Sequence, residues 1–230
     1  HKAEVVKLHF PESLKDIIAA RSQLLTEYQD AAYASRYREA LSKFEARESA
    51  VLSSSSLSVI AAKDLAKLMA YKDEYEVARL HTDAGLLQRI EKEFEGDFTV
   101  THHLAPPLLS QKKDARGRPV KKTFRRGVRP LMRGLRMART VRGSWLDPFG
   151  YARERRLERA LIVWFESLLD YSLAEFDQKS GDTWNKLLSL PQEIRGYGPV
   201  KEAAVAKVFE EIWILAPELR EKAPVELKRL

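Results

Sequence analysis

The chain contains no cysteine, and this absence excludes several kinds of chemistry. Disulfides, thiolate nucleophiles, cysteine-ligated zinc and iron–sulfur clusters all need sulfur atoms that these 230 residues do not supply. A chain without disulfides also fits a reducing compartment, so we expect a cytoplasmic location.

Long apolar runs are missing too. The longest one is Ala160–Phe165, whereas a helix needs roughly 20 apolar residues to cross a bilayer. The first residues, His1–Glu4, carry no hydrophobic signal region, so neither a membrane span nor export is expected. Because the chain starts at His1 instead of Met, we expect it to be a segment of a longer polypeptide.

Familiar catalytic motifs are absent as well. The sequence contains no G-x-x-x-x-G-K-[ST] phosphate loop, no H-E-x-x-H and no G-x-S-x-G. The adjacent His102 and His103 would point to opposite faces of a strand, which suits a shared metal ion badly. We therefore predict no catalytic, cofactor-binding or metal-binding residue in this chain.

A glycine-containing turn is a weak candidate for an anion site. Gly196 and Gly198 precede a predicted helix, where backbone N–H groups could approach a phosphate and Lys201 would add positive charge. The third glycine of a phosphate-binding motif is absent, and no strand precedes the turn. The sequence favours the alternative, a tight turn with Pro199 at the first helical position.

Helical periodicity dominates what is present. Apolar residues recur at three- and four-residue steps from Leu14 to Phe44, which predicts one helix of more than 30 residues. The hydroxyls of Ser53–Ser56 are expected to cap the next helix. Further helices are expected at about 57–78, 84–95, 128–138, 157–176, 184–190 and 200–215.

One stretch alternates with a period of two. Phe98, Val100, His102 and Leu104 alternate with polar residues, and residues 120–124 are a plausible return strand. We predict a mainly α fold with long helices and one small β-hairpin at about 98–125. We expect a single helical domain over residues 1–230, with a potential subdivision near 96–126.

Positive charge is concentrated in one segment. Residues 111–142 contain 13 Lys or Arg and one acidic residue, so the segment carries +12 although the whole chain carries +7. Four arginines recur at steps of four, three and three and would line one helical face. The predicted docking face comprises Lys112, Lys113, Lys121, Lys122, Arg125, Arg126, Arg129, Arg133, Arg136 and Arg139.

Such a face attracts acidic protein surfaces and phosphates. Aromatic residues for base stacking are scarce, since only Phe124 lies within the segment and Trp145 just beyond it, which weakens the case for single-stranded nucleic acid. Acidic residues elsewhere are expected to pair locally, as Glu76 does with Arg79 or Lys72 at helical spacing.

Several stretches together resemble a known family. They are Lys67–Leu80, Phe94–Phe98, His103–Leu109, Leu146–Tyr151, Glu154–Arg156 and Ile194–Gly198 with Val200 and Lys201. In this order and spacing they resemble the C-terminal region of the fused, single-chain indolepyruvate ferredoxin oxidoreductases. The resemblance extends from about Leu14 to Phe209.

The resemblance implies a non-catalytic assembly or docking domain of a larger enzyme. Such enzymes oxidise aryl-2-oxoacids with thiamine pyrophosphate, magnesium and 4Fe-4S clusters, pass electrons to ferredoxin and transfer the acyl group to coenzyme A. Their cofactor motifs lie upstream of the matched region, so no catalytic residue is carried over.

The implied partners are the upstream domains, further copies in a homo-oligomer, and ferredoxin or coenzyme A at the basic face. A free-standing helical module that binds nucleic acid or protein through residues 111–142 is the alternative.

Overall fold

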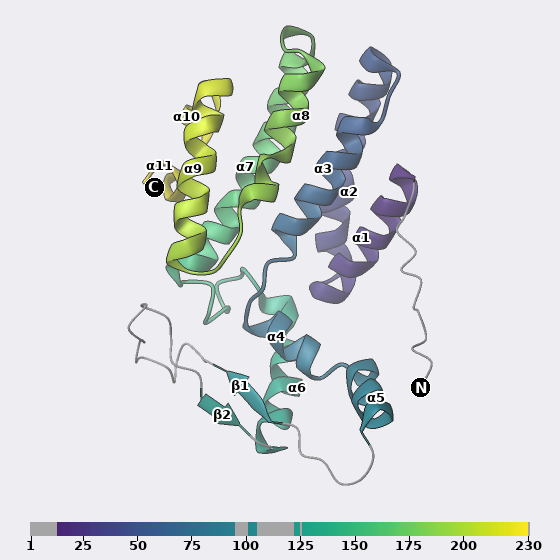
Figure 1. Cartoon of the computed structure of the whole chain (residues 1–230), viewed down its shortest axis with the longest axis vertical. Coiled ribbons are helices and arrows are strands. Elements are labelled where there is room, and N and C mark those ends of the chain that lie inside the picture. The colour runs from purple at the N-terminus through teal and green to yellow at the C-terminus, as the bar shows by residue number, and fades with distance from the viewer. Residues whose placement is uncertain (1–12, 95–100, 105–121, 125, 230) are drawn as a thin grey trace. The chain divides into compact units, whose positions relative to one another are not determined.

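The chain folds into two compact units, the first formed by residues 1–70 and 160–230 and the second by residues 71–159. The computed structural model describes residues 13–94, 101–104, 122–124 and 126–229 (Figure 1). The predicted mainly α fold is confirmed. The subdivision expected near 96–126 lies inside the second unit, whose borders are Tyr71 and Arg159.

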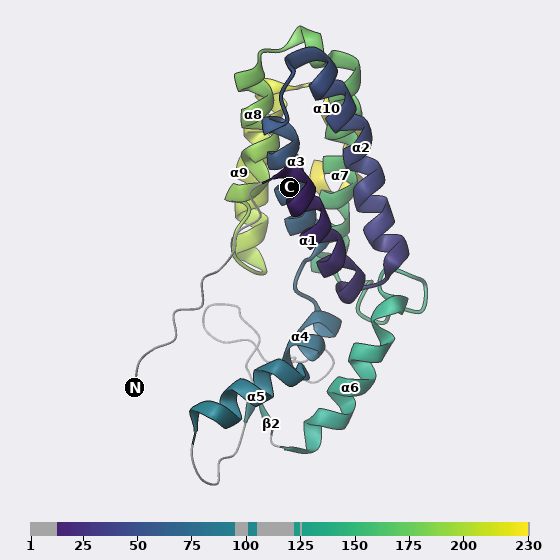
Figure 2. The same ribbon diagram turned by 90° about the vertical axis from the view of Figure 1, so that its right-hand side faces the viewer.

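The first unit is a bundle of helices. Within it α1, α2 and α3 pack on one another, α3 packs on α8, and α8 packs on α9 (Figures 1 and 2). Its elements are α1 (Leu14–Tyr28), α2 (Ala31–Leu52), α3 (Ser56–Met69), most of α7 (Arg153–Glu175), η3 (Phe176–Gln178), α8 (Gly181–Ser189), η4 (Leu190–Glu193), α9 (Pro199–Leu215), α10 (Leu219–Lys222) and α11 (Val225–Lys228).

Aromatic side chains fill the core of this bundle. The ring of Trp164 on α7 lies 4.8 Å from that of Phe209 on α9, and Phe176 stacks on Trp184 at 5.9 Å. The indole Nε1 of Trp184 donates to the Phe176 carbonyl at 3.1 Å, so this buried polar atom is satisfied. The contact between Trp164 and Phe209 joins two helices that are distant in sequence.

The long helix predicted from Leu14 to Phe44 is wrong, because two helices occupy that stretch. The chain leaves helical geometry at Gln29, and the Asp30 carboxylate accepts from the Tyr33 backbone N–H at 2.8 Å, capping α2. Both α1 and α2 bury an apolar face, so the three- and four-residue spacing continues across the break.

The helix predicted over 57–78 also divides. The end of α3 at Met69 and the beginning of α4 (Glu74–His81) are separated by a short segment that ends in Asp73. The Asp73 carboxylate accepts from the Glu76 backbone N–H at 2.8 Å and so caps α4. Here again an aspartate caps the start of a new helix within a stretch of continuous apolar periodicity.

The N-terminus of α3 is capped by a glutamate from another helix. Ser55 makes no side-chain capping hydrogen bond. The fully buried Glu48 of α2 accepts from the backbone N–H groups of Leu57 at 2.8 Å and Ser58 at 2.7 Å, and from the Ser58 hydroxyl at 2.5 Å. The Ser54 hydroxyl accepts from the Ser56 N–H at 3.1 Å, so the serine cap expected from the sequence is present and the buried glutamate adds a tertiary cap to it.

The second unit contains short elements. They are α4, α5 (Ala84–Glu93), β1 (His102–Leu104), β2 (Lys122–Phe124), η1 (Arg126–Val128), α6 (Arg129–Met137), η2 (Ala138–Val141) and the first turns of α7. Helix α4 packs on α6. The strands are antiparallel with His103 opposite Thr123, which confirms the hairpin at its two strands. Its other residues, 98–100, 105–121 and 125, lie outside the described ones.

The tertiary cap yields a test. Replacing Glu48 with Gln keeps the volume but places an amide N–H₂ against donors, so we expect the free energy of unfolding to fall by roughly 1–3 kcal/mol. Urea denaturation followed by circular dichroism measures the change. Glu45→Gln on the exposed side of α2 is the matched control. A Glu48→Gln chain as stable as the control would contradict the capping role.

Candidate functional site

A buried ion pair organises the second unit. The Arg142 guanidinium donates to the two oxygens of Asp73 at 2.5 and 2.9 Å, and each side chain is only 3% exposed. The guanidinium carbon also lies 5.4 Å from the centre of the Tyr75 ring. Since Asp73 caps α4 as well, one carboxylate anchors both the beginning of α4 and the residue that follows η2.

A second buried carboxylate, Asp147, shapes the loop from Arg142 to Ala152. One of its oxygens accepts from the Tyr75 hydroxyl at 3.0 Å and the Phe149 N–H at 3.1 Å, and the other accepts from the Gly143 N–H at 2.8 Å. Burial and the hydrogen bond to Asp147 raise the pKa of the Tyr75 hydroxyl. Every oxygen of this carboxylate is thus used within the fold.

The end of the loop is held just as closely. Arg159 donates to the Gly150 carbonyl at 2.6 Å. A Cβ atom at position 150 would lie 2.8 Å from Oδ2 of Asp147, so a larger residue there would have to displace this carboxylate. Tyr151 donates its hydroxyl to the Trp145 carbonyl at 2.8 Å, which ties the two ends of the loop together.

Two further ion pairs border the network. Arg79 donates to Glu76 through two bonds of 2.8 Å, which confirms the local pairing expected from their spacing. Arg155 of α7 donates to Glu74 of α4 at 3.2 and 3.3 Å. The three ion pairs Arg142–Asp73, Arg79–Glu76 and Arg155–Glu74 therefore neutralise and orient their own members, which is the arrangement of a structural network.

The predicted basic face is only partly a single surface. Arg129, Arg133 and Arg136 lie on α6, but the helix ends at Met137 and Arg139 lies on the 3-10 turn that follows. Lys122 lies on β2 and Arg126 on η1. Lys112, Lys113, Lys121 and Arg125 lie outside the described residues.

The four arginines predicted to share one helical face differ in environment. Arg133 is exposed, whereas Arg136 is half-buried and donates to the Thr82 carbonyl at the end of α4 at 3.3 Å. Arg139 donates to the Arg136 carbonyl at 3.4 Å. The face predicted as one stripe therefore divides into a solvent-facing part and a part that positions α6 against α4.

The Gly196–Gly198 turn has an internal explanation. Gly196 has φ +95° and Gly198 φ +55°, a region that favours glycine. A Cβ atom at Gly196 would lie 2.7 Å from Cγ1 of Val200, so close packing on the beginning of α9 requires this glycine. The candidate anion site thus coincides with the tight turn that the sequence favoured.

Nearby, α3 is attached to η4 by polar contacts. Lys67 donates to the Pro191 carbonyl at 2.7 Å, and Gln192 donates to the buried Asp64 at 2.9 Å. Burial lowers the pKa of Lys67, and the charges of Arg195 and Lys201 lower it further, while Asp64 opposes them. These positive charges lie close enough to influence one another, and both Lys67 and Arg195 donate to backbone carbonyls of η4.

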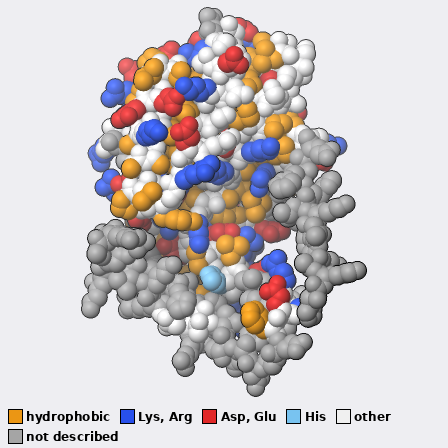
Figure 3. Space-filling model, in the orientation of Figure 1, with side chains coloured by type: hydrophobic (Ala, Val, Ile, Leu, Met, Phe, Trp, Pro, Cys, Tyr) orange, Lys and Arg blue, Asp and Glu red, His pale blue; other side chains and the backbone are white. Residues whose placement is uncertain are grey.

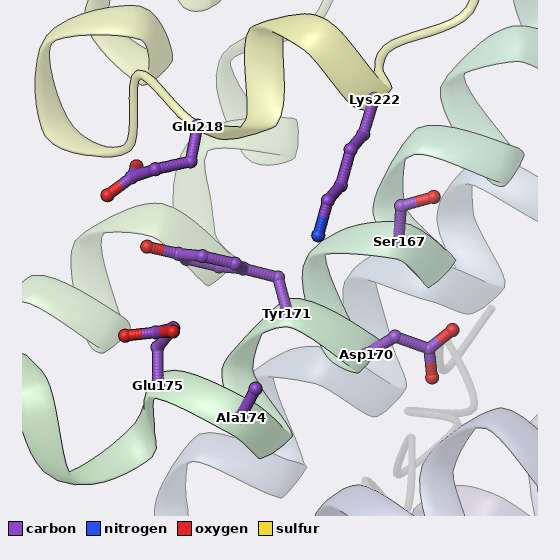
Figure 4. Close-up of a pocket in the computed structure, with 7 residues that line it drawn as sticks. All are labelled: Ser167, Asp170, Tyr171, Ala174, Glu175, Glu218 and Lys222. Carbon is purple, nitrogen blue, oxygen red and sulfur yellow. The ribbon is translucent and has the colours of Figure 1, made fainter.

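A shallow pocket of about 440 Å³ lies beside Tyr171 (Figure 4). Burial and the nearby carboxylate of Glu218 raise the pKa of the Tyr171 hydroxyl to about 12. The ammonium of Lys222 points toward the ring, 6.0 Å from its centre, and Lys179 lies at 5.8 Å. The chain's own cations already occupy the aromatic face.

Charge on the first unit is mixed in sign. On the face drawn in Figure 3, Lys and Arg lie among Asp and Glu over its helices. Within the described ranges, no group of three or more His, Asp or Glu residues is placed to hold a metal ion. No helix in the same ranges is both long and apolar enough to cross a membrane.

These features define a mainly helical protein in which buried carboxylates such as Glu48, Asp73 and Asp147 accept hydrogen bonds from the protein's own groups. The chain belongs to a family of unknown function, DUF6537, which it matches over residues 14–213. No curated protein and no solved structure matches it.

Sequence reasoning missed the partners of the buried charges and the exposed aromatics. In the sequence Arg142 is one of many basic residues, yet its guanidinium is withdrawn from water by Asp73, which lies 69 residues away in the chain. Trp145 is 81% exposed and Tyr151 67% exposed. The consecutive residues Trp145 to Phe149 are apolar except for Asp147, so nothing in the sequence indicates which of these side chains face water.

The ion pair gives a first test of this network. Arg142→Met removes one charge and leaves Asp73 buried, so we expect the free energy of unfolding to fall by about 3–5 kcal/mol. Chemical denaturation monitored by circular dichroism measures this loss. Arg156→Met, at an exposed position of α7, should stay within about 0.5 kcal/mol of the unmodified chain. Equal effects of the two substitutions would contradict the organising role.

Asp64 gives a second test, in the dependence of stability on pH. Burial raises its pKa from 3.8 to about 6. Between these values the folded chain keeps a proton that the unfolded chain releases, so stability falls as pH rises and levels off above pH 6. Asp64→Asn should remove this decline and stabilise the neutral-pH protein by up to about 3 kcal/mol.

Thermal unfolding between pH 4 and 7 measures the effect, with the exposed Asp170→Asn as the control. An identical pH profile for Asp64→Asn and the unmodified chain would show that Asp64 ionises normally in the fold.

Proposed function

We propose that this chain is a non-catalytic docking or assembly domain of a cytoplasmic indolepyruvate or related 2-oxoacid:ferredoxin oxidoreductase. The observation that supports the proposal is that residues of the stretches resembling that family contact one another. The pairs Tyr75–Asp147 and Glu74–Arg155 each join one signature stretch to another. Residues that share a signature because they hold a fold together are expected of a structural domain.

The network also argues for a non-catalytic role. A general base needs a carboxylate or imidazole with free acceptor capacity within reach of a substrate. The oxygens of Asp73 and Asp147 already accept several hydrogen bonds each, and both residues are buried. Both carboxylates therefore stabilise the fold, and the proposed contribution of this unit to an enzyme is a docking surface.

In this proposal the cofactors belong to upstream domains of the same polypeptide. The chain has no cysteine to ligate a 4Fe-4S cluster. It also lacks the glycine–aspartate motif that binds the diphosphate of thiamine pyrophosphate with magnesium. The partners proposed for the chain are those upstream domains and further copies in a homo-oligomer.

The basic face is the proposed docking surface for ferredoxin. Ferredoxins are typically acidic, so a positively charged surface would speed their encounter through electrostatic steering. Arg129 and Arg133 are the residues to test, because Arg136 also positions α6 against α4. The phosphates of coenzyme A are a second candidate ligand for the same face.

The test is charge reversal in the full-length enzyme. We expect Arg129→Glu combined with Arg133→Glu to lower kcat/KM for ferredoxin at least tenfold at low ionic strength, and much less at high salt. Indolepyruvate-dependent reduction of ferredoxin is measured, together with reduction of a small artificial acceptor to show that the catalytic centre is intact. Lys15→Glu combined with Lys43→Glu changes the net charge equally on the first unit.

Equal ferredoxin kinetics in the two double variants would contradict docking at this face. If kcat/KM for coenzyme A changes instead, the face binds its phosphates. The nucleic-acid alternative predicts that the 230-residue chain binds a DNA duplex at about 50 mM salt, and that binding weakens steeply as salt rises. Such binding, with ferredoxin kinetics unchanged, would replace the docking proposal.

A further inference from the structure

The loop from Arg142 to Ala152 is held rigidly by hydrogen bonds along its whole length. Successive turn hydrogen bonds join Asp147 N–H to the Ser144 carbonyl at 3.1 Å and Gly150 N–H to the Asp147 carbonyl at 3.2 Å. The bonds to Asp147 described above fix the loop from its buried side. A loop held this firmly has lost most of its backbone freedom before any partner arrives.

This rigid loop presents large apolar side chains to water. Trp145 is 81%, Tyr151 67% and Leu146 56% exposed. Residues of this size are usually well buried in a folded chain. Because all three lie on one fixed loop, a partner that covers them would remove a large apolar area from water at little cost in conformational entropy.

Helix α6 extends the same chemistry. Leu131 and Met137 are exposed on it, although Met132 beside them is buried. The apolar residues that face water are therefore a Trp, a Tyr, a Met and two Leu within 21 residues of chain. Phosphate groups offer nothing to the aliphatic members of this set.

The charged residues of the region are also of one type. Residues 126–156 contain nine Arg, no Lys and two acidic residues. Arg142 and Arg155 are paired with Asp73 and Glu74, and the remaining arginines outnumber the acidic residues of the segment by five. Protein interfaces are enriched in Trp, Tyr, Met and Arg and depleted of Lys, Glu and Asp. This composition matches a protein interface, and its charge complements an acidic partner.

We infer that the loop from Arg142 to Ala152 is the apolar anchor of the docking surface, and that Trp145 inserts into an apolar pocket on an acidic protein partner. The inference rests on the proposed docking function and names the element that holds the partner. Exposed arginines such as Arg133 set the rate of encounter. The anchor sets how long the complex lasts, because an aromatic side chain leaving its pocket controls dissociation.

The experiment measures binding kinetics with immobilised ferredoxin from the same cells as the acidic probe and the full-length protein in solution. We expect Trp145→Ala to raise the dissociation rate at least about 30-fold and to change the association rate less than threefold. Trp145→Phe should recover most of the affinity. Tyr151→Phe keeps the ring but removes the bond to the Trp145 carbonyl, so it should raise the dissociation rate several-fold.

Ile214→Ala is the matched control, since Ile214 on α9 is 80% exposed and lies on the first unit. Its dissociation rate should stay within about twofold of the unmodified protein. Unchanged dissociation in Trp145→Ala, with binding still weakened by Arg129→Glu and Arg133→Glu, would overturn the anchor and leave the docking proposal standing. No binding by the unmodified protein at low salt would overturn both.

Discussion

The second unit depends on a carboxylate and a guanidinium that are both withdrawn from water. Isolated, either charge would be costly to bury, and the pair is tolerated because Asp73 and Arg142 form two short hydrogen bonds and Asp73 also satisfies a backbone N–H of α4. The consequence is geometric. One residue before α4 and one residue after η2 are held together, and the loop that follows Arg142 begins from a fixed point.

The same device, a buried carboxylate that accepts backbone N–H groups, recurs in both units. Glu48 caps α3 from a neighbouring helix, and Asp147 folds the loop around itself. A carboxylate that accepts several such bonds is an architectural element, because its oxygens have little capacity left for a substrate. The groups of this unit that remain available to a partner lie on its surface. They are arginines of α6, such as Arg133, and the exposed aromatic residues of the loop. The proposed docking role rests on this division between buried carboxylates that are used within the fold and exposed residues that are apolar or positively charged.

Local interactions of the candidate site were open to prediction from the sequence, and distant ones were not. The pairing of Glu76 with Arg79 follows from their helical spacing. The contact of Arg136 with Thr82 crosses 54 residues, so the spacing of arginines on α6 could not reveal that this one faces inward. Helix breaks show the same limit. Asp30 and Asp73 each cap the start of a new helix. Aspartate also occurs within helices, and the apolar spacing continues after both residues, so the sequence does not reveal that a helix has ended there.

The sequence by itself determined the helical class, the two strands of the hairpin, helices α5 to α9 near their true positions and the place of the positive charge, because each depends on residue type and short-range spacing. Only the tertiary structure decided that Glu48 caps α3, that Arg142 is an interior residue, that Gly196 is needed for packing on Val200 and that Trp145 faces water. Each of these depends on which segments meet in space. A charge or an aromatic ring has the same letter in the sequence whether its neighbours are water or protein, and burial alone decides its role.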